Sequence, residues 1–385
     1  MKGVKFLPIL FGFFVMGFVD VVGTATAYVK NDFGLTDKVA SFLPSMIFLW
    51  FFVASIPTGM LTSRIGRKNT VLVSLVITVV AMFLPLAIYN KYIVFISFAL
   101  LGIGNTVIQA ALPPLMSNVV SQKKLTSSLT LGQFVKALCA AISPIIAVTA
   151  AIKFGNWKLI FPFYGVVTLI SGLWLMLTPM EREEKVKTDT TFMGCLSLLK
   201  DPYILAMFTG ILFVVGVDVG MGFSIPPYLQ DVCQLDLDHA AMGPTVYFIA
   251  KTIGAFLGAM ILAKFNPSKC FPISALIALA GALGMLFFKQ AIPVLICVSV
   301  ASLGIANIFG MVFGLAMNKH PEHANAISGL MVMAIAGGAI IPPVMGAVQS
   351  AVGPSGLVYV LIACILYLLG LGFFASKNAV VLEES

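Results

Sequence analysis

Long runs of apolar residues, separated by short polar breaks, recur along the whole chain and constrain its fold more than any other feature. Twelve such runs are present, near residues 6–28, 42–62, 69–89, 92–118, 127–152, 158–178, 202–228, 242–263, 270–288, 291–317, 324–350 and 353–375. A helix needs about 20 apolar residues to cross a bilayer. Only 10% of the 385 residues are charged, against about 25% in soluble proteins. The sequence therefore predicts an all-α polytopic membrane protein with twelve transmembrane helices.

Lys and Arg are unevenly shared between the two sets of loops. With the N-terminus inside, the inner segments hold 15 of these residues and the outer segments hold 6. Because cytoplasmic loops carry the excess of positive charge, both termini are predicted to be cytoplasmic, in the inner membrane of a bacterium. The same bias accounts for the net charge of +8 without a nucleic-acid partner.

The two halves of the sequence repeat one another. FVMGFVDVV (14–22) recurs as FVVGVDVGM (213–221), and LGIGN (101–105) recurs as LGIAN (303–307). We predict a six-helix half at 1–178, a cytoplasmic linker at 179–201 and a second six-helix half at 202–385. Two parallel repeats of this kind form a substrate site near the membrane midplane.

Four charged residues fall well inside the apolar runs, namely Asp20, Asp218, Lys136 and Lys251. Such residues are costly in a membrane and commonly mark ion or substrate pathways. We expect Asp20 to pair with Lys136 and Asp218 to pair with Lys251. These pairs could be structural salt bridges, or at least one acid could couple transport to protons. Asp20 is the stronger candidate for the proton site and Asp218 the second.

Amides and tyrosines inside the runs could bind a polyhydroxylated ligand. The candidates are Asn105, Gln109, Gln133, Tyr164, Tyr247, Asn307 and Asn325. Amides supply both donors and acceptors, and Asn105 and Gln109 share one helical face. The alternative is that these side chains form hydrogen bonds between helices.

Several classes of protein lack their motifs in this chain. The 6 cysteines are scattered without metal-ligand spacing, and the two histidines of HPEH (320–323) have no companion ligands. No phosphate-binding loop and no nucleophile–histidine–acid set are present. The sequence therefore predicts neither an enzyme, nor a metal site, nor a cofactor, and the proton is the expected coupling ion.

The segment GMLTSRIGRK (59–68) resembles the signature loop of the major facilitator superfamily, G-x-L-x-D-R-x-G-R-R/K. In that pattern Gly59 permits close helix approach, Gly66 makes the turn, and Arg64, Arg67 and Lys68 hold the cytoplasmic end. Ser63 replaces the aspartate of the pattern, so the charge network that latches the inward gate would be weakened. The resemblance implies two six-helix halves working by alternating access.

Two further stretches are similar to the fucose–galactose–glucose:proton symporter family. They are residues 328–350 and the D-F-G-L-T-like loop at 32–36. The resemblance implies proton-coupled uptake of a monosaccharide with the coupling acid at Asp20. The family's second acid, on the fourth helix, falls at Ile108 here, which leaves a one-acid scheme or a facilitator.

Other functions on the same fold stay open. Lys136 and Lys251 could instead bind a small organic anion, or the protein could be a drug:proton antiporter. A non-transporting membrane sensor is a more distant alternative. The expected partners are a small-molecule substrate and the lipid bilayer, and the expected oligomeric state is a monomer.

Overall fold

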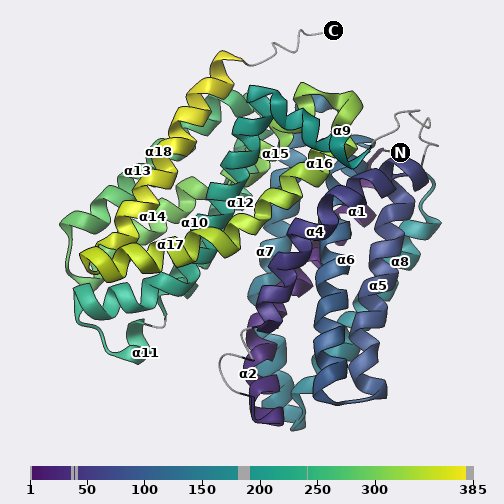
Figure 1. The fold of residues 1–385 in the computed structure, drawn as a ribbon, viewed down its shortest axis with the longest axis horizontal. Helices are drawn as coiled ribbons and strands as arrows, with labels where there is room; N and C mark the ends of the chain where they lie inside the picture. Colours follow the sequence, from purple (N-terminus) through teal and green to yellow (C-terminus); the bar gives the residue numbers. More distant parts are fainter. Residues whose placement is uncertain (1, 36–38, 40–41, 181–190, 241, 379–385) are drawn as a thin grey trace. The chain divides into compact units, whose positions relative to one another are not determined.

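The computed structural model of the chain consists of helices, and its described residues contain no β-strand (Figure 1). The structure describes residues 2–35, 39, 42–180, 191–240 and 242–378. The side chains of a few residues within helices, Asp20 among them, lie outside the described part. The predicted linker is therefore described only at its two ends.

The N-terminal half contains nine helical segments in the described residues up to Leu177. They are α1 (Lys2–Met16), the 3₁₀ helix η1 (Gly17–Asp20), α2 (Val21–Phe33), α4 (Phe42–Ile65), α5 (Arg67–Ala87), α6 (Lys91–Ser117), α7 (Gln122–Phe154), η2 (Trp157–Leu159) and α8 (Ile160–Leu177). Two short segments follow the linker, namely α9 (Phe192–Ser197) and η3 (Leu198–Lys200).

The C-terminal half begins with the long helix α10. Its described segments are α10 (Pro202–Cys233), α11 (Leu237–Ala240), α12 (Gly243–Leu262), α13 (Pro267–Phe287), α14 (Ala291–Ile305), α15 (Ile308–Lys319), η4 (Pro321–His323), α16 (Ala324–Met333), η5 (Ala334–Ala336), α17 (Gly337–Val352) and α18 (Gly356–Lys377).

These helices follow the apolar runs because a backbone inside a membrane must satisfy its own polar groups. Polar residues and glycines separate them. Gly66 has φ 88° between α4 and α5, and Gly155 has φ 63° after α7; both values favour glycine. The side chain of Asn90 caps α6 by accepting a hydrogen bond from the Ile93 N–H.

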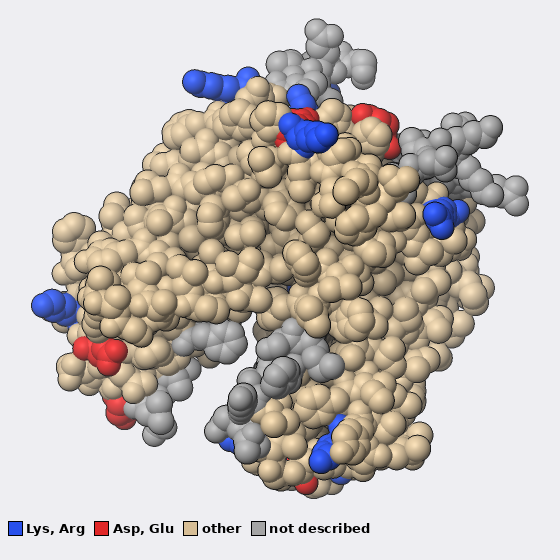
Figure 2. Space-filling model, in the orientation of Figure 1, with Lys and Arg blue, Asp and Glu red and all other residues tan. Residues whose placement is uncertain are grey.

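Eleven helices of the described residues are long and apolar enough to cross a membrane, and a shorter apolar segment, Lys5–Val19, occupies the first predicted span. On the face drawn in Figure 2, charged side chains lie near the ends of helices and leave a wide uncharged surface between them. Large apolar side chains such as Phe52 and Ile253 are exposed on the spans. An exposed surface of this kind suits lipid rather than water, so the chain is an integral membrane protein.

The helices form two compact units, and each unit draws on both sequence halves. Unit 1 contains Met1–Ser121, Gly132–Ser197 and His323–Met333, whereas unit 2 contains Gln122–Leu131, Leu198–Glu322 and Ala334–Ser385. Within unit 1, α16 packs on α4 and α6. Within unit 2, Thr126 and Thr130 at the start of α7 lie against Gly314 and Gly310 of α15.

In the part of the chain that the structure describes, three spans are interrupted near their middle. The 3₁₀ turn η1 separates α1 from α2, residues Ala306 and Asn307 separate α14 from α15, and η5 separates α16 from α17. An interrupted span exposes backbone groups and helix ends that can bind an ion or a substrate at the membrane midplane. These interruptions therefore show where a site can form.

Candidate functional site

The interruption of the first span lies at the carboxylate that the sequence singles out. α1 ends at Met16, and the backbone of Gly17–Asp20 forms one 3₁₀ turn before α2 begins. The side chain of Asp20 lies outside the described residues, so its pairing with Lys136 stays a prediction. The backbone places Asp20 at a helix interruption rather than inside a regular helix.

Two amides of α6 secure the end of α1. Asn105 Nδ2 donates to the carbonyl oxygen of Met16 at 2.7 Å, and Gln109 Nε2 donates to Asn105 Oδ1 at 2.6 Å. Both amide side chains are buried. Because the last carbonyls of a helix lack partners within it, the Asn105 bond stabilises the interruption next to Asp20.

Helix α7 packs against the same turn. A Cβ atom on Gly17 would lie 2.7 Å from the carbonyl oxygen of Lys136 and 2.7 Å from Cβ of Cys139, so only glycine fits here. The ammonium group of Lys136 has no ion-pair partner among the side chains that the structure describes. Within the same described set, Gln133, three residues earlier, has no hydrogen-bond partner. Helix α7 thus carries two polar side chains near the interruption that have no partner among the described residues.

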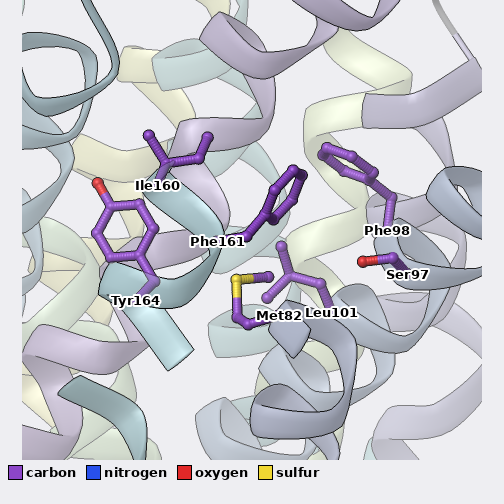
Figure 3. A pocket seen from close by; sticks show the side chains of 7 residues that line it. All are labelled: Met82, Ser97, Phe98, Leu101, Ile160, Phe161 and Tyr164. Atoms are coloured by element: carbon purple, nitrogen blue, oxygen red, sulfur yellow. The ribbon is translucent and has the colours of Figure 1, made fainter. Parts of the chain in front are cut away.

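Tyr164 of α8 packs on Phe18, with ring centroids 4.2 Å apart. Its hydroxyl is buried and has no hydrogen-bond partner in the described part of the chain. Figure 3 shows the apolar gap that Tyr164 lines together with Met82, Ser97, Phe98, Leu101, Ile160 and Phe161. This gap has no room for a water molecule, and the Ser97 hydroxyl donates to the Ala81 carbonyl. It is an apolar packing gap.

Unit 2 contains the Asp218–Lys251 ion pair that the sequence predicts. Lys251 Nζ lies 2.5 Å from Asp218 Oδ2, and the Tyr247 hydroxyl donates to Asp218 Oδ1 at 2.7 Å. Tyr247 and Lys251 are four residues apart on α12, so both face α10. Tyr247 is fully buried, and Ser302 of α14 donates to its carbonyl oxygen at 2.6 Å. We refer to Asp218, Tyr247 and Lys251 as the triad.

Asn307 lies at the interruption between α14 and α15. Its Nδ2 donates to the carbonyl oxygen of Gly254 on α12 at 3.1 Å, and the side chain packs against Gly258. Its Oδ1 is buried without a partner among the described residues. Asn307 and its repeat counterpart Asn105 therefore use the same chemistry, a bond from the amide to a backbone carbonyl of a neighbouring helix.

Asn325 lies with the predicted gating loop, not with the other candidate binding residues. Its Nδ2 donates to Ser63 Oγ at 3.2 Å, and its Oδ1 accepts from Arg67 Nε at 2.9 Å. Arg67 also donates to the Pro114 carbonyl at 3.1 Å and to Ser117 Oγ at 3.2 Å. One guanidinium group thus joins α5, α6 and α16 inside unit 1.

The other residues of the loop have separate roles. Gly59 permits the contact with α16, since a Cβ there would lie 2.8 Å from the Asn325 carbonyl oxygen. Lys68 Nζ donates to the carbonyls of Met176 and Thr178, at 2.9 and 2.8 Å, and so caps α8. Arg64 is exposed.

Sequence reasoning missed a polar centre around Asp32 in unit 1. Asp32 Oδ2 accepts from the Tyr89 hydroxyl at 2.6 Å and from Trp157 Nε1 at 3.0 Å, and Lys158 Nζ lies 3.9 Å away. Burial and the Asp32 carboxylate raise the pKa of Tyr89. The D-F-G-L-T-like loop contains Asp32, but no spacing in the sequence links it to Tyr89 or Trp157.

A second missed cluster surrounds His320 in unit 2. Its Nε2 lies 2.9 Å from Asp201 Oδ2 and its Nδ1 lies 3.2 Å from Glu322 Oε1. Asp201 also caps α10 by accepting from the Tyr203 N–H at 2.8 Å. Partial burial raises the pKa of Asp201, but the hydrogen bonds from His320 and Tyr203 outweigh it and hold that pKa below its usual value. No group of three or more potential metal ligands occurs in the described residues.

The structure thus brings the predicted residues into three places. Asn105 and Gln109 meet the Asp20 turn, Tyr247 joins Asp218 and Lys251, and Asn325 joins the gating loop. Apolar spans, interrupted helices and buried polar groups at mid-span define a polytopic transport protein rather than an enzyme.

The chain belongs to the Major Facilitator Superfamily, whose family model matches residues 9–343. It is 26% identical over 387 residues to a glucose/galactose transporter of Brucella abortus, covering 95% of this chain and 92% of that one. It is 29% identical over 396 residues to a putative glucose/galactose transporter of Helicobacter pylori, covering 95% and 94%.

The structure of the Escherichia coli fucose:proton symporter FucP has the same fold. It superposes with a TM-score of 0.85 at 18% identity and covers 97% of this chain and 98% of that chain. The twelve-helix fold and the superfamily predicted from the signature loop are therefore confirmed, with the first of the twelve spans interrupted.

Proposed function

We propose that the protein takes up a monosaccharide together with protons by alternating access of its two six-helix halves, with Asp20 carrying the proton. The observation that supports this function is the interruption of the first span at Asp20. Asn105 holds the end of α1 there, and α7 packs on Gly17. Lys136 and Gln133 of α7 have no polar partner among the described side chains.

A carboxyl group at such a place can work as a proton carrier. An Asp at the centre of a membrane helix costs about 2.5–3.5 kcal/mol unless water or a cation compensates it. A nearby cation favours the carboxylate, whereas loss of water or of the cation favours the acid. A rearrangement that changes the distance to Lys136 or the access of water would make Asp20 bind or release a proton.

The substrate class follows from the chemistry of the spans and from the relatives. The candidate site of unit 1 offers neutral amides, and the ionised triad of unit 2 balances its own charge. These groups suit a neutral polyol. The names of the relatives, glucose/galactose transporter and fucose:proton symporter, support the same class.

The candidate binding residues then divide by role. Gln109 and Gln133 would contact the sugar, because Gln133 has no other partner in the described residues. Asn105 would position the Asp20 turn and Asn307 the α14–α15 interruption. Tyr164 would support the first span by packing on Phe18, and Asn325 would act in the gating loop.

The setting of this transport is part of the proposal. The excess of Lys and Arg in alternate loops supports cytoplasmic termini in the inner membrane of a bacterium. The protein would act as a monomer in the bilayer. It would need no cofactor and no nucleic acid, and the proton would be the coupling ion.

The test is the pH outside lightly buffered, de-energised vesicles after addition of D-glucose, D-galactose or L-fucose. Symport predicts that the outside becomes more alkaline with at least one sugar and that Asp20→Asn abolishes the change. Asp32→Asn is a matched control, because Asp32 is an acid near the end of α2, beyond the first apolar run and away from the interruption. It should keep the pH change.

Two results would overturn the proposal in different ways. Labelled sugar that enters without any pH change would show a facilitator. Absence of both sugar entry and pH change, with folded protein in the vesicles, would exclude sugar transport.

A second candidate function rests on Lys136, whose ammonium group has no carboxylate partner among the described side chains. Such a cation could bind a small organic anion. Lys136→Gln should then abolish transport of the anion. If the protein is a sugar transporter, the same variant should keep measurable sugar binding and change mainly the pH dependence of transport.

A further inference from the structure

We infer that the triad of Asp218, Tyr247 and Lys251 is a sugar-binding centre of unit 2 and that Asp218 does not carry the coupled proton. In this centre Lys251 donates to one hydroxyl group of a neutral polyol, and Asp218 accepts from an adjacent one. The inference rests on the proposed function and adds the residues that recognise the substrate.

The triad keeps unused hydrogen-bonding capacity. A carboxylate has about four acceptor positions, and an ammonium group has several donors. The described contacts use one donor of Lys251 and one position on each oxygen of Asp218. Acceptors and donors therefore remain side by side in a single ion pair.

Two of the three side chains of the triad are partly accessible. The side chain of Asp218 is 14% exposed and that of Lys251 is 25% exposed, whereas Tyr247 is fully buried. The buried Tyr247 hydroxyl thus positions the Asp218 carboxylate, and the hydrogen bond from Ser302 to the Tyr247 carbonyl positions the backbone of Tyr247.

The unused acceptor positions of Asp218 and the unused donors of Lys251 suit a polyol better than an anion. Each sugar hydroxyl both donates and accepts, so two adjacent hydroxyls can bind Asp218 and Lys251 without separating them. A neutral ligand also leaves the charge balance of the pair unchanged. An anion would compete with Asp218 for Lys251 and would leave a buried carboxylate without its partner, which is strongly unfavourable.

Asn307 contacts α12 about one turn beyond the triad. It bonds to Gly254, three residues after Lys251, which is about 4.5 Å further along the helix axis. Its Oδ1 is buried and has no donor in the described residues. A buried acceptor without a donor destabilises the protein, so Asn307 acts on the helix interruption next to the triad and does not itself contact the sugar.

The test is the binding of D-glucose, D-galactose and L-fucose to purified protein, measured by calorimetry. Asp218→Asn and Lys251→Gln should weaken binding roughly ten- to a hundredfold, as expected for a lost bond to a charged group. Asp231→Asn and Lys264→Gln remove the same charges from exposed positions of unit 2 and should bind as the unchanged protein does.

A conservative variant separates binding from folding. Lys251→Arg keeps the ion pair, but its rigid fork engages both oxygens of Asp218 and changes the reach of the donors. Sugar binding should weaken while the thermal unfolding temperature stays unchanged. Full binding by Lys251→Arg and Lys251→Gln would show that the triad is only structural, and the inference would then be wrong.

Exchange of labelled sugar across vesicles in the absence of a proton gradient tests the role of Asp218. Asp20→Asn should keep exchange and lose uphill accumulation, whereas Asp218→Asn should lose both. Exchange by Asp218→Asn with loss of accumulation would identify it as a proton carrier and overturn the inference. Failure of the unchanged protein to bind any sugar would instead overturn the proposed function, and binding of an organic anion that Lys251→Gln abolishes would replace the polyol.

Discussion

Single side chains hold the places where the spans are interrupted. The amide of Asn105 donates to the Met16 carbonyl and accepts from Gln109, so one residue connects α6 to the turn at Asp20. Because both bonds are buried, loss of that amide leaves the Met16 carbonyl and the Gln109 amide without these partners. Replacing such a buried amide should lower the free energy of unfolding more than replacing an exposed polar residue at a helix end.

Asn105→Leu should lower the free energy of unfolding by about 1–3 kcal/mol, because the Met16 carbonyl and the Gln109 amide lose a partner in a buried site. Thermal unfolding in detergent measures the change. Ser350→Ala is the control, since the Ser350 hydroxyl is exposed and bonds only to Gly346 of its own helix. Equal unfolding temperatures for the two variants would contradict the structural role of Asn105.

Asp201 gives a prediction for pH. Its pKa in the folded protein is below the usual value because hydrogen bonds from His320 and Tyr203 outweigh partial burial. Its ionised form therefore stabilises the fold above the unfolded pKa of about 4, and this stabilisation is lost as the pH falls through the lowered folded pKa. Asp201→Asn should unfold at a lower temperature than the unchanged protein at pH 7.

The difference in unfolding temperature between Asp201→Asn and the unchanged protein should shrink below pH 4. The difference in free energy of unfolding at neutral pH should be about 1 kcal/mol or less, the loss of a cap on α10 at a partly exposed site. A difference that stays constant from pH 7 to pH 3 would show that the charge of Asp201 does not matter. Asp231→Asn, at an exposed position of the same helix, controls for general loss of a negative charge.

Helix packing depends on close approach at a few glycines. Gly17 lies between the end of α1 and the backbone of α7, with Lys136 and Cys139 in direct contact. In membrane proteins, small residues let helices approach closely enough for dispersion forces to hold them together. The turn at Asp20 therefore depends on α7 as well as on α6.

Gly17→Ala should reduce uptake strongly and lower the unfolding temperature, because the added Cβ would lie 2.7 Å from a backbone oxygen that cannot move alone. Overpacking of this kind costs typically about 1–3 kcal/mol. Gly172→Ala is the matched control, since its Cβ would meet only the Leu75 side chain at 3.8 Å. Uptake by Gly17→Ala at the level of Gly172→Ala would contradict the packing described above.

The positions of the helices could be predicted from the sequence, but their interruptions could not. Hydropathy reports how deep a residue lies, and it placed Asp218 and Lys251 at a common level, where they do form a pair. It does not report the direction of a side chain, so the bond between Asn325 and Arg67 could not be predicted from it. The turn at Ala334 lies in continuous apolar sequence, and the turn at Gly17 differs from its surroundings only in Asp20. Neither sequence separates the turn from regular helix, so contacts with distant helices decide.

The two compact units of the whole molecule are not the two halves of the sequence. α16 belongs to unit 1, and Arg67 and Ser63 bind its Asn325. Transport by the proposed alternating access requires the two sequence halves to move relative to one another. The contacts between the gating loop and α16 would then have to break in each cycle.

Ser63→Asp should therefore slow uptake. A carboxylate next to Asn325 and Arg67 would strengthen these contacts, and about 1 kcal/mol of added stability changes the population of a state roughly fivefold. Initial rates of sugar entry measure the effect, with binding affinity as the control for an intact site. Faster entry would show that the contacts of α16 do not limit the cycle.

The interleaving of the units also bears on how the chain is made. When the first 197 residues have been synthesised, every segment of unit 1 is present except His323–Met333. Gln122–Leu131, which belongs to unit 2, has also been made by then, but the other segments of unit 2 have not. Domains usually fold in the order of their synthesis, but here unit 1 lacks its last segment until Met333 has been made, and unit 2 needs Ala334–Ser385 as well. The early spans must therefore persist in the membrane as an unfinished assembly until the late helices arrive, and during that interval the insertion machinery or chaperones would have to shield their polar groups.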